Sequence, residues 1–200
     1  MSFYSRVMTH TAVSPEKAAR VPLAGRAIVE LLNSRPHAIH ADRLDDPDYA
    51  ARIVDKVAPG IGLLTPPALE QLRGIRADLT AIATAASPDE AETGWRDFSV
   101  RTSGVALQQD FSVPGEVKLR QVAGDPVVGG VALSVAELVS SGAWSRVRIC
   151  ANPNCEGAFY DTTRSRTQRW DSYDTCGNRN NVAAYRARTR ESSSAASGAA

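Results

Sequence analysis

The chain has few histidines and cysteines, and it has no long apolar run. Its 200 residues include 3 His and 3 Cys. No stretch approaches the roughly 20 apolar residues that a membrane-spanning helix needs, and residues 1–13 lack the apolar core of a secretory signal. With 43% hydrophobic and 22% charged residues, the composition is that of a soluble globular protein. We therefore expect a cytoplasmic protein without a membrane partner.

The scarcity of histidine also narrows the catalytic options. His37 and His40 stand three positions apart in a polar stretch with no third ligand nearby, which favours a surface loop over a metal site. Gly129-Gly130 lacks the G-x-G-x-x-G context of a nucleotide-binding loop. No Ser–His–Asp or Cys–His arrangement stands out. We therefore expect a protein that is not an enzyme.

Lysine is scarce as well, and the basic charge that remains is unevenly distributed. The chain has 20 Arg and 3 Lys, which we attribute in part to the codon use of a GC-rich genome. Residues 1–143 carry 14 basic and 17 acidic side chains, whereas residues 144–190 carry nine Arg and four acidic residues, a net charge of +5. Such segregation indicates either a polyanion-binding module or a solvated basic surface.

Apolar residues at helical spacing predict an α-rich domain over residues 21–142, preceded by a loose arm at residues 1–20. Four expected helices begin where a capping residue precedes a proline, at Asp46-Pro47, Thr65-Pro66, Ser87-Pro88 and Asp125-Pro126. Another helix follows Pro22. Alternating charged and apolar residues at 116–120 predict a small hairpin between about 104 and 122. Trp95 and Phe98 are expected in the core.

A boundary near Gly142 separates this domain from a small module at residues 143–190, and the Ser-, Ala- and Gly-rich tail at 191–200 is expected to be disordered. The expected fold class is α+β, mostly α. It combines a helical N-terminal domain that has a small β element with a small module of the hairpin-plus-helix type.

All three cysteines lie in the basic segment. Cys150 and Cys155 flank Asn152-Pro153-Asn154, a turn that lets both thiols reach one metal ion. An odd number of cysteines in a chain expected to be cytoplasmic argues against a disulfide framework. Structural zinc takes four ligands in a tetrahedron, and Cys176 is the only cysteine left to serve as the third. We therefore expect Zn²⁺ as a structural cofactor.

The fourth ligand is predicted to be Asp171. It precedes Cys176 by the same four-residue gap that separates Cys150 from Cys155, and a carboxylate oxygen is an acceptable zinc ligand. Asp161 and Asp174 are the alternatives, although Asp174 stands too near Cys176 for the chain to loop round an ion. In a further alternative, water replaces Asp171 and the site is that of a zinc hydrolase, but a convincing general base is missing.

The motifs of the basic segment resemble those of the CGNR zinc-finger family over about residues 144–190. They are Phe159-Tyr160-Asp161, Arg166, Arg169-Trp170 and Cys176-Gly177-Asn178-Arg179. In that family a cysteine ligand follows the tryptophan, and here Asp171 takes its position. More faintly, the helices ending at Leu31-Leu32-Asn33-Ser34 and covering Leu72–Leu79 resemble the Ala-rich ABATE-type domain that usually precedes this finger. The resemblance implies a small bacterial transcription regulator of a stress-induced type.

Cys176-Gly177-Asn178 is expected to begin a helix whose free N–H groups point toward the thiolates. On this helix Arg179, Arg186 and Arg190 lie within about 40° of one another, while Val182 and Tyr185 would pack on the knuckle. Together with Arg166 and Arg169 from the preceding loop, these arginines are predicted to bind the phosphates of double-stranded DNA.

The expected function is DNA binding in transcriptional regulation, in which the N-terminal domain senses a small-molecule effector or forms a homodimer. The alternative is a protein–protein adaptor. In that case zinc is only structural and the arginines meet an acidic partner.

Overall fold

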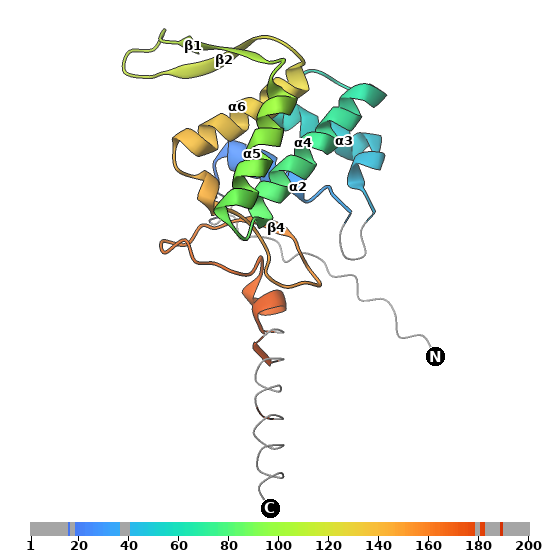
Figure 1. Cartoon of the computed structure of the whole chain (residues 1–200), viewed down its shortest axis with the longest axis vertical. Coiled ribbons are helices and arrows are strands. Elements are labelled where there is room, and N and C mark those ends of the chain that lie inside the picture. The colour runs from blue at the N-terminus through green and yellow to red at the C-terminus, as the bar shows by residue number, and fades with distance from the viewer. Residues whose placement is uncertain (1–15, 17–18, 37–40, 179–180, 183–188, 190–200) are drawn as a thin grey trace, which may run out of the picture.

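The protein is described by a computed structural model that covers residue 16 and residues 19–36, 41–178, 181–182 and 189. The helices are α2 (Leu23–Leu32), α3 (Pro47–Val57), α4 (Pro66–Thr84), α5 (Pro88–Thr102) and α6 (Pro126–Ser140), and they form one bundle (Figure 1). Two antiparallel strand pairs accompany it: β1 (Ala106–Asp110) with β2 (Lys118–Ala123), and β3 (Val147–Ile149) with β4 (Ala158–Tyr160). The mostly helical α+β class is confirmed.

The short helical turns are η1 (Arg43–Asp45), η2 (Trp144–Arg146) and η3 (Tyr173–Gly177). Residues 178, 181–182 and 189, which follow η3, are also helical. Among the described residues, no helix is both long and apolar enough to cross a membrane. The expectations for His37, His40, residues 1–15 and residues 191–200 fall outside the described part of the chain.

The four helix starts that carry a capping residue and a proline are confirmed. The side chains of Asp46, Thr65, Ser87 and Asp125 each accept a backbone N–H of the following turn. Each such cap contributes about 1 kcal/mol to stability. At the Ser87 start, the Glu90 carboxylate also accepts the N–H of Ala86, the residue before the cap.

Helix α6 packs against α2, α3, α4 and α5 and supplies much of the core. Its two glycines are buried. A Cβ on Gly130 would lie 2.0 Å from the carbonyl oxygen of Val57, so this glycine allows α3 and α6 to approach closely. Phe98 is buried, and Trp95 meets both Phe98 and Trp144 edge-on at the margin of the same core. The core assignment of Trp95 and Phe98 is confirmed.

The predicted hairpin is present as β1 and β2, which project from one end of the bundle (Figure 1). Pairing runs from Ala106 opposite Ala123 to Asp110 opposite Lys118, and the register shifts between Ala106 and Leu107. Large apolar side chains are exposed along the strands and the turn, namely Leu107, Phe111, Val113, Val117, Leu119 and Val122. The hairpin therefore offers an apolar surface that the described residues leave largely uncovered.

The second hairpin lies at the opposite end of the bundle and shares its core (Figure 1). Val147 and Ala158 are buried among the helical residues, β4 lies against α2, and β3 lies against α4. A Cβ on Gly25 of α2 would lie 3.0 Å from the ring of Tyr160. The apolar core therefore continues across the boundary predicted at Gly142, and the division into domains stays a prediction.

Candidate metal centre

A tight turn after β3 brings the first two thiols together. The N–H of Cys150 donates to the carbonyl of Gly157 (2.8 Å), and the N–H groups of Cys155 and Glu156 both donate to the carbonyl of Asn152 (2.9 and 3.0 Å). The side chain of Asn152, which is buried, accepts the N–H of Asn154. Glu156 takes a φ of 50°, which turns the chain back toward β4. These bonds form a closed knuckle between the two cysteines.

The third thiol comes from η3, and all three sulfurs converge. Cys150, Cys155 and Cys176 are buried and free of disulfides, and their Sγ atoms lie within 4.8 Å of one another. Phe159 and Trp170 pack with them in a small apolar cluster apart from the main core. Co-ligands of one tetrahedral zinc lie about 3.5–3.8 Å apart, since a Zn–S bond is about 2.3 Å long. A metal ion that prefers thiolates therefore fits this donor set.

Hydrogen bonds favour a thiolate at Cys150. They lower its pKa to about 6, chiefly through a bond from Cys155, with further bonds from the N–H groups of Asp171 and Asn152, while burial opposes them. The pKa of Cys155 is raised, because this thiol donates to Cys150 and because it is buried. The Cys150 environment thus stabilises the deprotonated form, which is the form that binds a metal.

Asp171 lies beside the sulfur cluster. Its Oδ2 atom is 3.8 Å from Sγ of Cys155. The group of possible ligand atoms that all lie within 4.8 Å of one another nevertheless contains only the three sulfurs. It does not include a carboxylate oxygen of Asp171. Asp171 is thus adjacent to the cluster, and its role as fourth ligand stays a prediction. Asp174, one of the two alternatives, is exposed in the first turn of η3.

Asp161, the other alternative, is occupied elsewhere. Its side chain is fully buried (0% exposed) and accepts the N–H of Thr163 (2.8 Å), the hydroxyl of Thr163 (2.5 Å) and the N–H of Gln168 (2.9 Å). Arg148 lies 3.8 Å away. Burial raises the pKa of Asp161, but these hydrogen bonds and the charge of Arg148 outweigh it, so the pKa lies below its ordinary value. Asp161 therefore organises the loop that follows it.

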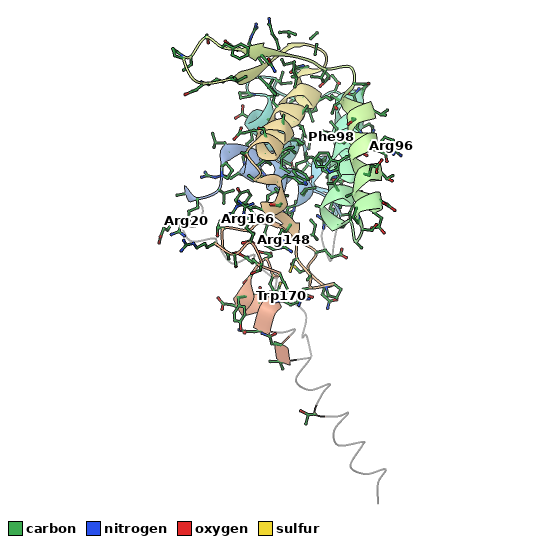
Figure 2. All side chains as sticks on the ribbon, turned by 60° about the vertical axis from the view of Figure 1, so that its left-hand side comes forward. Arg20, Arg96, Phe98, Arg148, Arg166 and Trp170 are labelled. Carbon is green, nitrogen blue, oxygen red and sulfur yellow. The ribbon has the colours of Figure 1, made fainter. Side chains whose placement is uncertain are left out.

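That loop presents three exposed arginines, Arg164, Arg166 and Arg169. Arg166 takes a φ of 56°, and its carbonyl accepts Nη1 of Arg148 at 2.9 Å. The guanidinium of Arg169 lies 5.3 Å from the ring centre of Trp170, and the carbonyl of Arg169 accepts the N–H of Ala151 in the knuckle (3.0 Å). The basic loop is therefore tied to the sulfur cluster, and Figure 2 shows Arg148, Arg166 and Trp170 at this end of the molecule.

Helical structure does run through Cys176, Gly177 and Asn178, but it begins three residues earlier than predicted. The helical turn η3 begins at Tyr173 and is capped by Ser172, whose hydroxyl accepts the N–H of Thr175. The N–H groups of Cys176 and Gly177 both donate to the carbonyl of Ser172 (2.9 and 3.1 Å). They are therefore engaged in the turn rather than free to face the thiolates.

Gly177 permits a close approach of two aromatic rings, because a Cβ there would lie 2.9 Å from Tyr173 and 3.1 Å from Trp170. A related expectation is corrected. Val182 is 48% exposed, so it does not pack on the knuckle as predicted.

Of the five arginines predicted to bind DNA, Arg166 and Arg169 lie exposed on the described loop. Arg179, Arg186 and Arg190 lie outside the described residues, as does Tyr185.

Two kinds of site residue escaped the sequence analysis. The loop-organising role of Asp161 has a local signal, because Asp and Thr two positions apart favour a side-chain-to-backbone turn. Asn33 and Arg35, which follow α2, also contact the segment just after the knuckle, at Ala158 and Glu156. Their partners lie more than 120 positions away along the chain, and no local pattern signals such contacts.

A comparison with known protein families matches residues 146–189 to the CGNR zinc finger. This confirms the resemblance noted for the C-terminal segment, and together with the three clustered cysteines it indicates a metal site. The likeness of the N-terminal part to an ABATE-type domain stays a prediction. No curated protein matches the chain.

Proposed function

We propose that the protein is a zinc-binding transcription regulator whose C-terminal segment contacts the phosphate backbone of double-stranded DNA. The observation that carries this proposal is the exposed basic loop with Arg164, Arg166 and Arg169, held beside the sulfur cluster. The guanidinium fork matches phosphate oxygens. Half or more of protein–DNA hydrogen bonds go to phosphates and sugars. A rigid loop that presents several arginines suits such contacts.

In this proposal zinc is structural, and Cys150, Cys155, Cys176 and Asp171 hold it. When bound, the ion supplies a fixed tetrahedral link between the knuckle and η3. The chain's own residues prepare the ligands, because the N–H groups of Asn152 and Asp171 already donate to the Cys150 sulfur. No part of this role requires catalysis.

The helical domain is proposed to form a homodimer through the β1–β2 hairpin, and a small-molecule effector is the other partner proposed for it. The hairpin exposes apolar side chains along both strands. The two outer edges differ in charge: β2 carries Lys118 and Arg120, whereas Asp110 is the only charged residue of β1. Two copies paired through β1 would avoid a clash of like charges. Dimerisation would also double the DNA contacts of a small finger.

Salt-dependent DNA binding tests the proposal. Fluorescence anisotropy on duplex DNA at several salt concentrations should show weaker binding to all sequences in Arg166→Ala and in Arg169→Ala. The slope of log K against log salt should fall by about one unit for each phosphate-binding arginine that is replaced. Arg96→Ala is the matched control, because Arg96 is exposed on α5, away from the basic loop (Figure 2).

Two results would count against DNA binding by this loop. Equal losses of affinity in Arg96→Ala and Arg166→Ala would indicate a general effect of charge. A zinc-loaded protein that does not bind duplex DNA at low salt would favour the adaptor alternative, in which an acidic protein meets the arginines.

A further inference from the structure

The end of α2 forms strand-like hydrogen bonds with β4, the strand that follows the knuckle. The side-chain amide of Asn33 donates to the carbonyl of Ala158 (2.9 Å) and accepts the N–H of Ala158 (2.7 Å). Ala158 is the first residue of β4. One side chain of the helical domain thus satisfies both backbone groups of a residue in the metal-binding segment. Such a two-point contact fixes orientation as well as distance.

Arg35 makes a second contact, nearer to the sulfurs. Its guanidinium donates to the carbonyl of Glu156, the residue after Cys155, and to the carbonyl of Leu32 (2.8 Å). Glu156 directly follows Cys155, so this contact places the guanidinium next to a predicted metal ligand along the chain.

The residue between them anchors this turn in the helical domain. Ser34 is buried, and its hydroxyl accepts Nη1 of Arg76 from α4 at 3.0 Å. Arg76 in turn holds both carboxylate oxygens of Asp42 (2.7 and 2.5 Å). The Ser34 carbonyl also accepts the N–H of Arg43 (2.9 Å). The turn that contacts the metal-binding segment is therefore fixed by a buried polar network on its other side.

We propose that the Asn33–Arg35 turn orients the metal-binding segment and that it couples metal affinity to the position of the C-terminal end of α2. Three thiolates and one carboxylate around Zn²⁺ leave a net charge of −2, which a neighbouring guanidinium offsets in part. Residues that orient metal ligands also tune metal affinity. Because coupling between two sites is reciprocal, bound zinc should also stabilise the end of α2. This inference rests on the proposed binding of zinc.

Zinc affinity, measured by competition with a chromophoric chelator, tests the coupling. Arg35→Gln and Asn33→Ala should each weaken zinc binding by about tenfold, the usual scale for a residue that orients metal ligands. Arg35→Lys keeps the charge and should weaken binding less than Arg35→Gln. Arg96→Gln controls for net charge. Ile53→Val controls for a general loss of stability, because Ile53 is a buried core residue of α3. Both controls should bind zinc like the parent.

Affinities within twofold of the parent for both Asn33→Ala and Arg35→Gln would overturn the proposal. Equal weakening in Arg35→Lys and Arg35→Gln would overturn its electrostatic part. Weakening in Ile53→Val as large as in Asn33→Ala would also overturn it, because general stability would then explain the effect.

Hydrogen exchange gives a second measurement in the parent protein. Removal of zinc by a chelator should speed amide exchange at the C-terminal end of α2 as well as at β4. Exchange in α2 that does not respond to zinc removal would overturn the coupling even if the variants prove unstable. None of these measurements involves DNA, so a protein that shows the coupling but does not bind DNA would contradict the proposed function alone.

Discussion

Asp171 occupies the position at which the CGNR pattern has a cysteine, and its carboxylate lies 3.8 Å from Sγ of Cys155. Asp171→Cys should tighten zinc binding, because thiolate is the softer ligand and suits a site that already has three sulfurs. Asp171→Ala should leave three ligands and release zinc more readily to a competing chelator. Zinc affinity measured for the parent and both variants checks this, and Asp174→Ala is the control. An Asp171→Ala protein that holds zinc as tightly as the parent would assign the fourth position to another group.

Asp161 is a stability determinant of the basic loop. Asp161→Asn replaces one acceptor oxygen with an amide that donates, so the N–H of Gln168 or the donors of Thr163 are left without their acceptor. The expected cost is about 2 kcal/mol at neutral pH, since hydrogen bonds to a buried charged group are worth about 1.5–3 kcal/mol each. Urea unfolding of the parent, Asp161→Asn and the exposed control Asp55→Asn measures it. An unchanged midpoint in Asp161→Asn would contradict this role.

The same residue predicts a pH dependence. Because the pKa of Asp161 is lower in the fold than in the unfolded chain, the stability it supplies is present above the unfolded value, about 3.9, and is lost as pH falls through the folded value. The difference in stability between the parent and Asp161→Asn should therefore shrink in acid. Thermal unfolding between neutral and acidic pH, with a chelator in every sample, follows it without a contribution from metal release. A difference that stays constant down to strongly acidic pH would contradict the assignment.

At this scale, residues with a local signal could be predicted and residues with distant partners could not. The cysteines could be identified as metal ligands from their spacing. Both the thiol side chain and the turn between Cys150 and Cys155 are local properties of the sequence. Asn33 and Arg35 carry no such mark, since their contacts depend on how β4 lies against α2.

At the scale of elements, the two adjacent glycines of α6 give a matched pair. A Cβ on Gly130 would meet the backbone of Val57 at 2.0 Å, whereas a Cβ on Gly129 would meet only the end of the Gln121 side chain. Gly130→Ala should destabilise the protein by about 1–3 kcal/mol, the usual cost of overpacking. In Gly129→Ala the Gln121 amide must give up the hydrogen bonds that it donates to the carbonyls of Ala123, Gly124 and Asp125. This loss offsets the gain of about 1 kcal/mol from alanine in the helix, so the net change should be smaller than in Gly130→Ala. Thermal unfolding of both variants checks this, and equal destabilisation would contradict the backbone clash.

Helix starts are the features that could be predicted most directly from the sequence. The reason is local: the capping side chain accepts an N–H of the turn that follows it, as at Asp46, Thr65, Ser87 and Asp125. The start of η3 is an exception for a physical reason. Ser172 caps it, but the conspicuous Cys-Gly-Asn run that follows suggests a start several residues later. A chemically distinctive motif need not coincide with the start of the element that carries it.

At the scale of the molecule, segments that differ in charge share one core. The change in charge near residue 143 predicts two modules, yet Val147 and Ala158 are buried among the helices. A charge pattern indicates which kind of partner a surface binds. It does not indicate which segments of the chain fold together. Because of this shared core, a metal site in the C-terminal segment can affect helix α2 in the N-terminal segment.

The β1–β2 hairpin carries the last prediction, which concerns assembly. A two-stranded hairpin is only marginally stable alone, and this one exposes Leu107, Phe111 and Leu119. If two copies pair antiparallel through β1 with Gln109 at the two-fold axis, Gln109 lies close to its own copy. Gln109→Lys and Gln109→Glu should then each weaken the dimer by repulsion between like charges, and an equimolar mixture of the two should restore it. Gln109 is suited to this test because its cross-strand neighbour, Leu119, is uncharged.

Sedimentation equilibrium over a range of concentrations would measure the association of the parent, of each variant and of the mixture. Val122→Lys is the control, because Val122 is exposed on β2, the strand whose edge would stay outside the four-stranded sheet. A parent that stays monomeric at concentrations well above those used for DNA binding would contradict dimerisation. Weakening by Val122→Lys as strong as by Gln109→Lys, or a mixture that fails to associate, would show that the copies do not pair through β1.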